Sequence, residues 1–326
     1  MLDKIRNKSF VILDGAMGTN LFKNGMISGE CPELWNIENP QKIKGIHRSF
    51  VEAGSDIILT NTFGGNNLRL KLHQLESKVK EINRAGAKLA KQCAGRKSFV
   101  AGSIGPTGEI LEPLGNLSYD NAVKSFNHQA VELAEGGVDL LWIETFSDIN
   151  EVKAAVEGSI ITGLPIVVTM SFDSSGKTMM GISPKEFISF IKEQKNIFAY
   201  GANCGLGFEE LQQTIGEMKN AGGKNIVAKS NCGIPVFHDG SVRYNATEKN
   251  FIDYAVKVRN LGAKFIGGCC GTEPDHIKKI KEALEISPYK FLKYEKKESS
   301  KIEIRQKVRR RKRRSKINST NPKSES

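Results

Sequence analysis

The chain has 326 residues, 39% of them hydrophobic, a length that exceeds most single cores but suits one α/β barrel. It has no apolar run of the roughly 18–20 residues that span a bilayer, so we expect no membrane contact. It also has no signal-peptide core and too few cysteines for a disulfide scaffold, so we expect a cytoplasmic protein. The net charge of +12 lies mostly in residues 301–326, which leaves the first 300 residues close to neutral.

Eight short apolar runs that end in small or polar residues have the pattern of buried strands leading into loops. In chain order they are Phe10–Leu13, Ile57–Thr60, Phe99–Ser103, Leu140–Glu144, Ile166–Ser171, Ala199–Asn203, Ile226–Lys229 and Phe265–Gly268. Each is followed by a stretch with helical apolar spacing, namely Ile43–Ala53, Val79–Cys93, Ala122–Ala134, Glu151–Ile161, Pro184–Lys192, Phe208–Met218, Lys249–Leu261 and Pro274–Leu284. This series predicts a (βα)8 TIM barrel; an open doubly wound sheet is the alternative.

The cysteines at two strand ends indicate a metal site. Cys269 and Cys270 follow the eighth run, and Cys204 follows the sixth in a similar setting. Adjacent cysteines bridge each other only with strain, whereas thiolates that converge on one point require a cation, and zinc is the usual one. Three thiolates with one open position are typical of a catalytic zinc site, where a bound substrate thiol would lose its proton.

The other strand ends carry polar side chains and glycines. Asp14 with Gly15 and Ala16 follows the first run, and the same end of the barrel is expected to hold Thr62, Glu144 and Asn231. This arrangement suits a small zwitterionic ligand beside a metal. None of the five histidines lies in these motifs, so a histidine base is not supported.

Six motifs occur in an order that resembles the homocysteine S-methyltransferase family. They are Asp14-Gly15-Ala16-Met17-Gly18-Thr19, Asn61-Thr62-Phe63-Gly64, Gly105-Pro106-Thr107-Gly108, Glu144-Thr145-Phe146, Asn203-Cys204 and Gly267-Gly268-Cys269-Cys270-Gly271-Thr272. The resemblance covers roughly residues 8–286 and is closest to the N-terminal homocysteine-binding module of cobalamin-dependent methionine synthases. It implies a (βα)8 barrel, zinc on Cys204, Cys269 and Cys270, and methyl transfer to the thiolate of L-homocysteine, which gives L-methionine.

The resemblance also implies roles in substrate binding. Asp14 and Glu144 would hold the amino group of homocysteine. Thr62 and backbone NH groups near Gly15 and Ala16 would receive its carboxylate.

The segment after the seventh run departs from the family pattern. Asn231 matches an asparagine near the metal, which would occupy the open zinc position when substrate is absent. Ser230 and Cys232 are atypical beside it. We interpret Cys232 as a small buried residue; the alternative is an additional thiol near the metal.

The resemblance to the synthase branch, carried by Gly271 after the cysteine pair, implies a methylated corrinoid as the methyl donor. Methylcobalamin would be supplied in trans by a separate protein, because the chain has no room for corrinoid or folate modules. The alternatives are an S-methylmethionine- or betaine-dependent enzyme, and the chain could also be one piece of a split methionine synthase. A competing hypothesis from another class is a non-catalytic thiol- or metal-binding barrel with a nucleic-acid-binding tail.

The C-terminal segments are predicted to lie outside the barrel of residues 1–286. Residues 287–300 have the pattern of a linker, and residues 301–326 hold eleven Lys or Arg against two Glu without apolar periodicity. This composition predicts a disordered basic tail. We interpret the tail as a solvated extension; contact with nucleic acid is the alternative.

Overall fold

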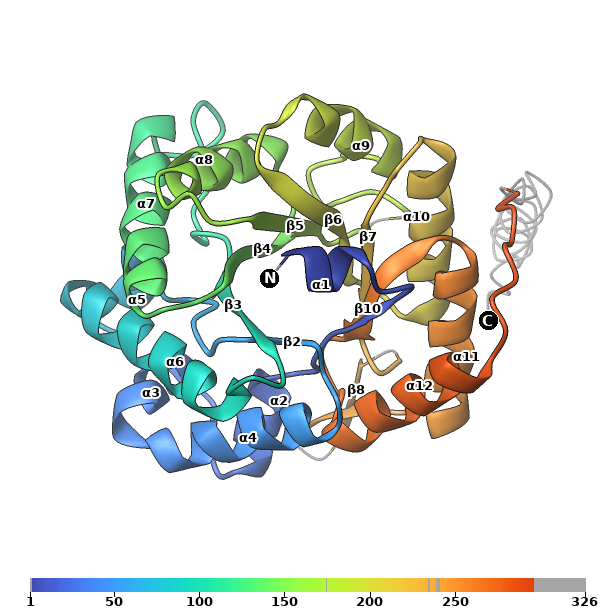
Figure 1. Cartoon of the computed structure of the whole chain (residues 1–326). Helices are drawn as coiled ribbons and strands as arrows, with labels where there is room; N and C mark the ends of the chain where they lie inside the picture. Colours follow the sequence, from blue (N-terminus) through green and yellow to red (C-terminus); the bar gives the residue numbers. More distant parts are fainter. Residues whose placement is uncertain (1, 174, 234, 239–240, 296–326) are drawn as a thin grey trace, which may run out of the picture. The chain divides into compact units, whose positions relative to one another are not determined.

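The computed structural model describes residues 2–173, 175–233, 235–238 and 241–295. Its centre is a parallel eight-stranded sheet in the order β1-β10-β7-β6-β5-β4-β3-β2 (Figure 1). The strands are β1 (Val11–Ile12), β2 (Ile57–Leu59), β3 (Phe99–Ile104), β4 (Leu140–Phe146), β5 (Ile166–Met170), β6 (Ile197–Cys204), β7 (Ile226–Ser230) and β10 (Ala263–Gly268). A parallel bridge between Leu13 and Ile57 joins the two outer strands, so the sheet closes. The predicted barrel is confirmed.

Eight helices surround the strands, one after each strand in the chain. They are α4 (Pro40–Glu52), α6 (Val79–Ala94), α7 (Tyr119–Glu135), α8 (Ile149–Ile160), α9 (Pro184–Glu193), α10 (Phe208–Asn220), α11 (Glu248–Asn260) and α12 (Pro274–Ile286). All eight correspond to predicted helices, because each has an apolar face and several also have start signals. At the start of α9, for example, Ser183 and Glu186 form a capping box. Among the described residues, no helix is both long and apolar enough to cross a membrane.

Several short elements in the connections were not predicted. They are α1 (Leu2–Arg6), α2 (Gly18–Lys23), α3 (Trp35–Glu38), α5 (Asn67–Lys71), two 3₁₀ turns (Pro32–Leu34 and Glu76–Lys78) and a hairpin of β8 (Pro235–His238) and β9 (Ser241–Tyr244). Such elements are too short to produce a clear apolar period. The hairpin follows β7 and ends at Tyr244, next to the cysteines described below.

The barrel interior is packed with side chains. Alternate strand residues point inward, so Val11 and Leu13 belong to the inner cluster while Ile12 packs with the surrounding helices. Ile5 of α1 is 1% exposed and joins the same inner cluster. Figure 1 shows α1 lying across the ring of strands. The apolar interior is therefore closed at the end where the strands begin.

Residues 287–294, which were predicted to begin a linker, remain in contact with the barrel. The guanidinium of Arg259 on α11 donates hydrogen bonds to the carbonyls of Leu284, Ser287 and Pro288. The backbone NH of Leu292 donates to the carbonyl of Asn260 at 2.8 Å. The compact unit accordingly reaches Tyr294. Residues 296–326, with the predicted basic tail, lie outside the described residues.

His47 on α4 makes the stability of the barrel depend on pH. Its side chain is 1% exposed, and its Nε2 has no hydrogen-bond partner among the described residues. Burial lowers the pKa of His47 from 6.5 to about 4. The unfolded chain therefore binds a proton more readily than the folded one, so stability is lost as the pH falls from 6.5 towards 4.

We expect His47 to lower the free energy of unfolding by about 2 kcal/mol between pH 7 and pH 5. Urea denaturation at both pH values measures this loss. The variant His47→Leu serves as the reference, since it retains the titration of every other group. Equal pH dependence in the two proteins would show that His47 does not contribute.

Candidate functional site

Three cysteine sulfurs converge at the C-terminal ends of the strands. The Sγ atoms of Cys204, Cys269 and Cys270 all lie within 4.8 Å of one another. Cys204 is the last residue of β6, and Cys269 directly follows β10. Cys204 has a φ of +62°, which is uncommon for a residue other than glycine and turns the chain out of the strand. The structure thus brings together residues more than sixty positions apart, as the sequence predicted.

The strand between these two cysteine loops holds them together. Asn231, just after β7, accepts a hydrogen bond from the backbone NH of Cys270 at 3.1 Å and donates one to the carbonyl of Gly205 at 2.8 Å. The backbone NH of Cys269 also donates to the carbonyl of Ser230 at 2.6 Å. Asn231 therefore lies beside the cluster, where its amide fixes the relative positions of the two loops.

The geometry and donor chemistry of the cluster fit zinc. Tetrahedral zinc with Zn–S bonds of about 2.3 Å places sulfurs about 3.8 Å apart, which is compatible with three sulfurs that all lie within 4.8 Å of one another. Asn203 donates to the Cys269 sulfur at 3.8 Å, and its amide also contacts Thr145 on β4. A hydrogen bond of this kind, donated to the ligand atom by a neighbouring side chain, orients a metal ligand.

The thiols hinder one another's ionisation. Hydrogen bonding with Cys204, followed by burial, raises the pKa of Cys269. For Cys204, hydrogen bonding with Cys269 lowers the pKa, but hydrogen bonding with Cys270 and burial outweigh it and raise the pKa to about 11. A cation at the centre of the cluster would reverse this balance, because it stabilises each thiolate.

Two predicted acidic residues lie inside the barrel mouth, together with a lysine that was not predicted. Asp14 Oδ1 lies 3.0 Å from Lys229 Nζ, and Asp14 Oδ2 accepts a hydrogen bond from the backbone NH of Leu59 at 2.7 Å. Glu144 Oε1 accepts a hydrogen bond from the Ser103 hydroxyl at 2.6 Å. The side chains of Asp14 and Lys229 are only 6% and 3% exposed. The predicted pair of carboxylates is therefore part of a buried charge cluster.

Opposing effects act on the charges of this cluster. Burial raises the pKa of Asp14 and of Glu144, and attraction to Lys229 offsets only part of this rise. Burial lowers the pKa of Lys229, but the attraction of the two carboxylates outweighs it and leaves the pKa raised. Lys229 is thus held as a cation. A lysine at the end of an otherwise apolar strand, Ile226–Lys229, was the available sequence signal for this charge.

The predicted carboxylate-binding groups are engaged with their neighbours in this structure. Thr62 is fully buried and donates its hydroxyl hydrogen bond to the carbonyl of Ser103 at 2.8 Å. The backbone NH of Ala16 donates to the carbonyl of Thr272 at 3.1 Å. Gly15 also packs against this residue, because a Cβ at position 15 would lie 2.8 Å from the Thr272 carbonyl oxygen. A ligand carboxylate would have to displace the partners of Thr62 and Ala16.

Tyr244, at the end of the unpredicted hairpin, borders the cysteine cluster. Its ring packs so closely on Gly271 that a Cβ there would lie 2.4 Å from the ring. Burial, followed by the negative charge of Cys270, raises the pKa of the Tyr244 phenol. The tyrosine consequently stays neutral and supplies an aromatic wall beside the sulfurs.

Cys232 lies outside the three-sulfur cluster. Its side chain is 2% exposed, and its sulfur lies 3.7 Å from Nε2 of His276 on α12. Its backbone NH donates to the carbonyl of Cys270 at 2.8 Å. This placement supports the interpretation of Cys232 as a small buried residue.

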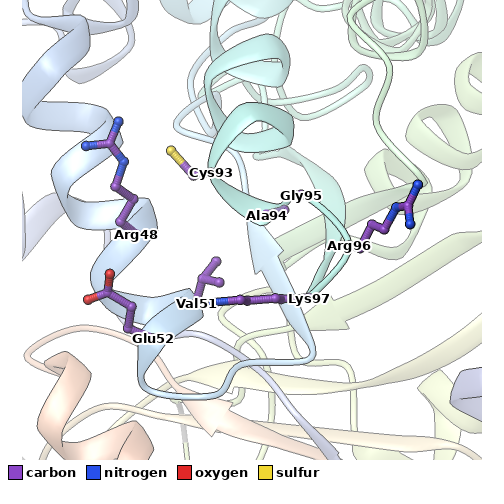
Figure 2. A pocket seen from close by; sticks show the side chains of 8 residues that line it. All are labelled: Arg48, Val51, Glu52, Cys93, Ala94, Gly95, Arg96 and Lys97. Carbon is purple, nitrogen blue, oxygen red and sulfur yellow. The ribbon is translucent and has the colours of Figure 1, made fainter.

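A second thiol-containing surface lies at the opposite end of the barrel. A pocket of about 180 Å³ opens between α4 and the end of α6 and is bordered by Arg48, Cys93, Arg96 and Lys97 (Figure 2). Arg96 and Lys97 precede β3, so the pocket is at the N-terminal side of the strands. In TIM barrels the active site forms at the other end. Cys93 is therefore a suitable control for the cysteine cluster.

Comparisons with known proteins agree with this architecture. The sequence profile described as homocysteine S-methyltransferase matches residues 11–284. Methionine synthase from Mycobacterium leprae is 28% identical over 290 residues, which cover 83% of this chain and 24% of that protein. The chain thus spans about a quarter of the length of this relative.

Solved structures of the homocysteine methyltransferase MmuM from Escherichia coli share the fold. The oxidized form has a TM-score of 0.72 at 22% identity, covering 86% of this chain and 97% of that one. The metallated form has a TM-score of 0.72 at 21% identity, covering 86% and 98%. Because the family profile extends over all eight barrel strands and the cysteine cluster, the chain belongs to the homocysteine S-methyltransferase family.

Proposed function

We propose that this protein transfers a methyl group to the sulfur of L-homocysteine, giving L-methionine, with zinc held by Cys204, Cys269 and Cys270. The observation that carries the proposal is the convergence of these three sulfurs within 4.8 Å at the barrel mouth, beside a buried acidic pair. Membership of the family supplies the substrate class. The metallated form of MmuM supports the presence of a metal in this fold.

The residues around the cluster would position homocysteine and the three sulfur ligands. When bound, zinc would lower the pKa of the homocysteine thiol, so that a thiolate is available at neutral pH. The thiolate sulfur then forms a bond to the methyl carbon as the bond to the donor atom breaks, and the donor retains that electron pair. Glu144 holds the substrate ammonium, and Asn231 and Asn203 keep the sulfur ligands in place. This fixed geometry removes much of the entropic barrier to a reaction between two molecules.

For the donor, we propose a methylated corrinoid carried by a separate protein. The support is the similarity to methionine synthase, of which this chain spans about a quarter, so a corrinoid would have to come from outside the described barrel. S-methylmethionine is the second candidate. The match covers 97% of the MmuM chain, so that homocysteine methyltransferase consists of little more than a barrel of this kind. This supports a protein that acts without further modules and therefore on a small donor.

No observation favours betaine. A quaternary ammonium is usually bound by an aromatic cage of several rings, whereas Tyr244 forms a single aromatic wall beside the sulfurs and both tryptophans are buried. Trp142 lies inside the barrel under Lys229, and Trp35 packs against Lys42. The alternative interpretation of the basic tail, contact with nucleic acid, falls on residues outside the described ones and has no support in the comparisons.

A panel of donors tests this function. The full-length, zinc-loaded protein is incubated with homocysteine and either methylcobalamin, S-methylmethionine, betaine or methyltetrahydrofolate, and methionine is measured by mass spectrometry. We expect methionine with methylcobalamin. Methionine only with S-methylmethionine would assign the chain to the second candidate, and no methionine with any donor would reject methyl transfer to homocysteine. Removing zinc with a chelator should stop the reaction, and adding zinc should restore it.

A further inference from the structure

A large pocket lies at the end of the barrel where the strands begin, opposite the three sulfurs. It has a volume of about 480 Å³, and its wall joins the residues before β1, the ends of α10 and α11, the start of β10, and the end of α12 with the segment after it. We call it the basal pocket. The wall residues that carry a charge or an aromatic ring are Phe10, Lys219, Arg259, Lys264, Glu285 and Tyr289. The volume lies within the range of small-molecule sites.

Arg259 brings a positive charge into this wall that no carboxylate neutralises within the described part of the chain. It is 5% exposed, and burial lowers its pKa, although a guanidinium stays protonated at any ordinary pH. Its five N–H groups donate to neutral oxygens, namely the carbonyls of Leu284, Ser287 and Pro288 and the Oδ1 of Asn260. A buried charge is normally paired, because it has lost its hydration. An anion in the basal pocket would neutralise Arg259.

Two lysines supply free donors to the basal pocket. The stem of Lys219 packs over Gly262, where a Cβ would lie 2.8 Å from the lysine Cδ. Lys264 donates to the carbonyl of Arg6 at 2.8 Å, which leaves two ammonium N–H groups for a ligand. Neither lysine forms an ion pair with a residue that the structure describes. Glu285 is exposed and is the one carboxylate among the described lining residues, so three cations and one anion give the wall a charge of +2.

Aromatic rings border these charges. Tyr289 is 62% exposed and lines the basal pocket together with Phe10. An exposed tyrosine offers a flat apolar face on which a ring of a ligand can stack. Two ammonium groups beside an unneutralised guanidinium suit a group with two negative charges, such as a phosphate ester. The wall therefore combines cations for a phosphate group with a face for a flat ring.

We propose that the basal pocket binds a mononucleotide-type anion, with the phosphate group held by Lys219 and Lys264 and a flat ring beside Tyr289. The phosphate charge would neutralise Arg259. The inference concerns the end of the barrel opposite the cysteine cluster and does not depend on methyl transfer. A bound anion would connect α10, α11 and β10 to the segment after α12, so it should also raise the temperature of unfolding.

Calorimetry with the full-length protein tests the basal pocket. AMP serves as the nucleotide probe, and inorganic phosphate serves as the probe for the charge alone. Both are titrated at constant ionic strength, because the basic residues 301–326 attract anions in general. We expect saturable binding of one AMP per chain and a Kd for phosphate that is about tenfold higher, since phosphate lacks the stacking ring. Tyr289→Ala should remove this difference.

A pair of double variants locates the binding site. Lys219→Gln/Lys264→Gln should raise the Kd for AMP by at least about tenfold, because charge-assisted hydrogen bonds are lost. The matched control is Lys80→Gln/Lys88→Gln, which removes two exposed lysines of α6 and should leave the Kd within about twofold of the wild-type value. If the substitution of Lys264, which also holds α1, unfolds the protein, Lys219→Gln alone is compared with Lys80→Gln.

Three results would overturn the inference. One is a wild-type protein that shows no saturable binding of AMP. Another is the same Kd for AMP in the two double variants, because AMP would then bind elsewhere on the chain. The third is equal affinity of the wild type for AMP and phosphate, which would refute the ring contact and with it the nucleotide. None of these results bears on the formation of methionine, which is measured separately.

Discussion

Replacing Cys269 by alanine is expected to remove both the bound metal and the formation of methionine. Cys269, like the other two thiols of the cluster, contacts both of its neighbours, and its sulfur also accepts a hydrogen bond from the amide of Asn203. Two remaining thiolates do not complete a zinc site of this type, so the metal content should fall from about one ion per chain to a small fraction. Replacing a residue that only hydrogen-bonds to a metal ligand typically lowers activity by up to about 100-fold. Removal of the ligand itself should therefore lower the activity by more than about 100-fold.

The matched control for this experiment is Cys93→Ala. Cys93 is a half-buried thiol at the other end of the barrel, where it donates a weak hydrogen bond to the carbonyl of Lys44 at 3.6 Å. Its removal should leave metal content and methionine formation unchanged. Metal analysis of the purified proteins and a methionine assay give the two readouts. A Cys269→Ala protein that keeps both its metal and its activity would refute the assignment of the site.

Replacing Glu144 by glutamine should weaken the use of homocysteine by about 100-fold in kcat/KM, within the range expected when one partner of a buried charge pair is removed. Glutamine has nearly the same size, and its amide oxygen can still accept the hydrogen bond from Ser103. What is lost is the negative charge opposite the substrate ammonium. We expect the change mainly in KM, because the ammonium is bound equally in the ground state and the transition state.

Glu132→Gln is the control for this second prediction. Glu132 is also a buried glutamate, but it lies on α7 and pairs with Arg84, away from the strand ends. Its replacement should lower stability without changing the KM for homocysteine. Binding of 4-mercaptobutanoic acid, which has the thiol and carboxylate of homocysteine but no amino group, should be the same in Glu144→Gln and the wild type. A Glu144→Gln protein with unchanged kcat/KM would show that the ammonium binds elsewhere.

The barrel could be predicted from the sequence because its strands are buried on both faces. Strands such as Ile166–Met170 therefore appear as short, nearly continuous apolar runs, separated by helices with a clear apolar face. The positions of Cys204, Cys269 and Cys270 followed from the same reasoning, since strand ends of a closed barrel meet at one mouth. Residues that are far apart in the sequence can therefore lie close together at this mouth.

Other features of the site depend on contacts that a linear pattern does not contain. The pairing of Lys229 with Asp14 joins residues 215 positions apart, and nothing in the local sequence of either residue specifies it. Tyr244 reaches the cysteine cluster through a hairpin too short to produce a distinct strand pattern. The contact of residues 287–294 with the barrel likewise depends on one side chain, Arg259, in a distant helix.

The packed interior of the barrel, which α1 covers where the strands begin, leaves the strand-end mouth as the route to the proposed reaction centre. Ile5 fills the barrel where its strands begin, and Lys264 fixes the helix by donating to the carbonyl of Arg6 at 2.8 Å. For a protein with the proposed activity, substrate and product would then pass through the same opening, the one beside the three sulfurs. Methionine therefore has to depart through this opening before another homocysteine enters.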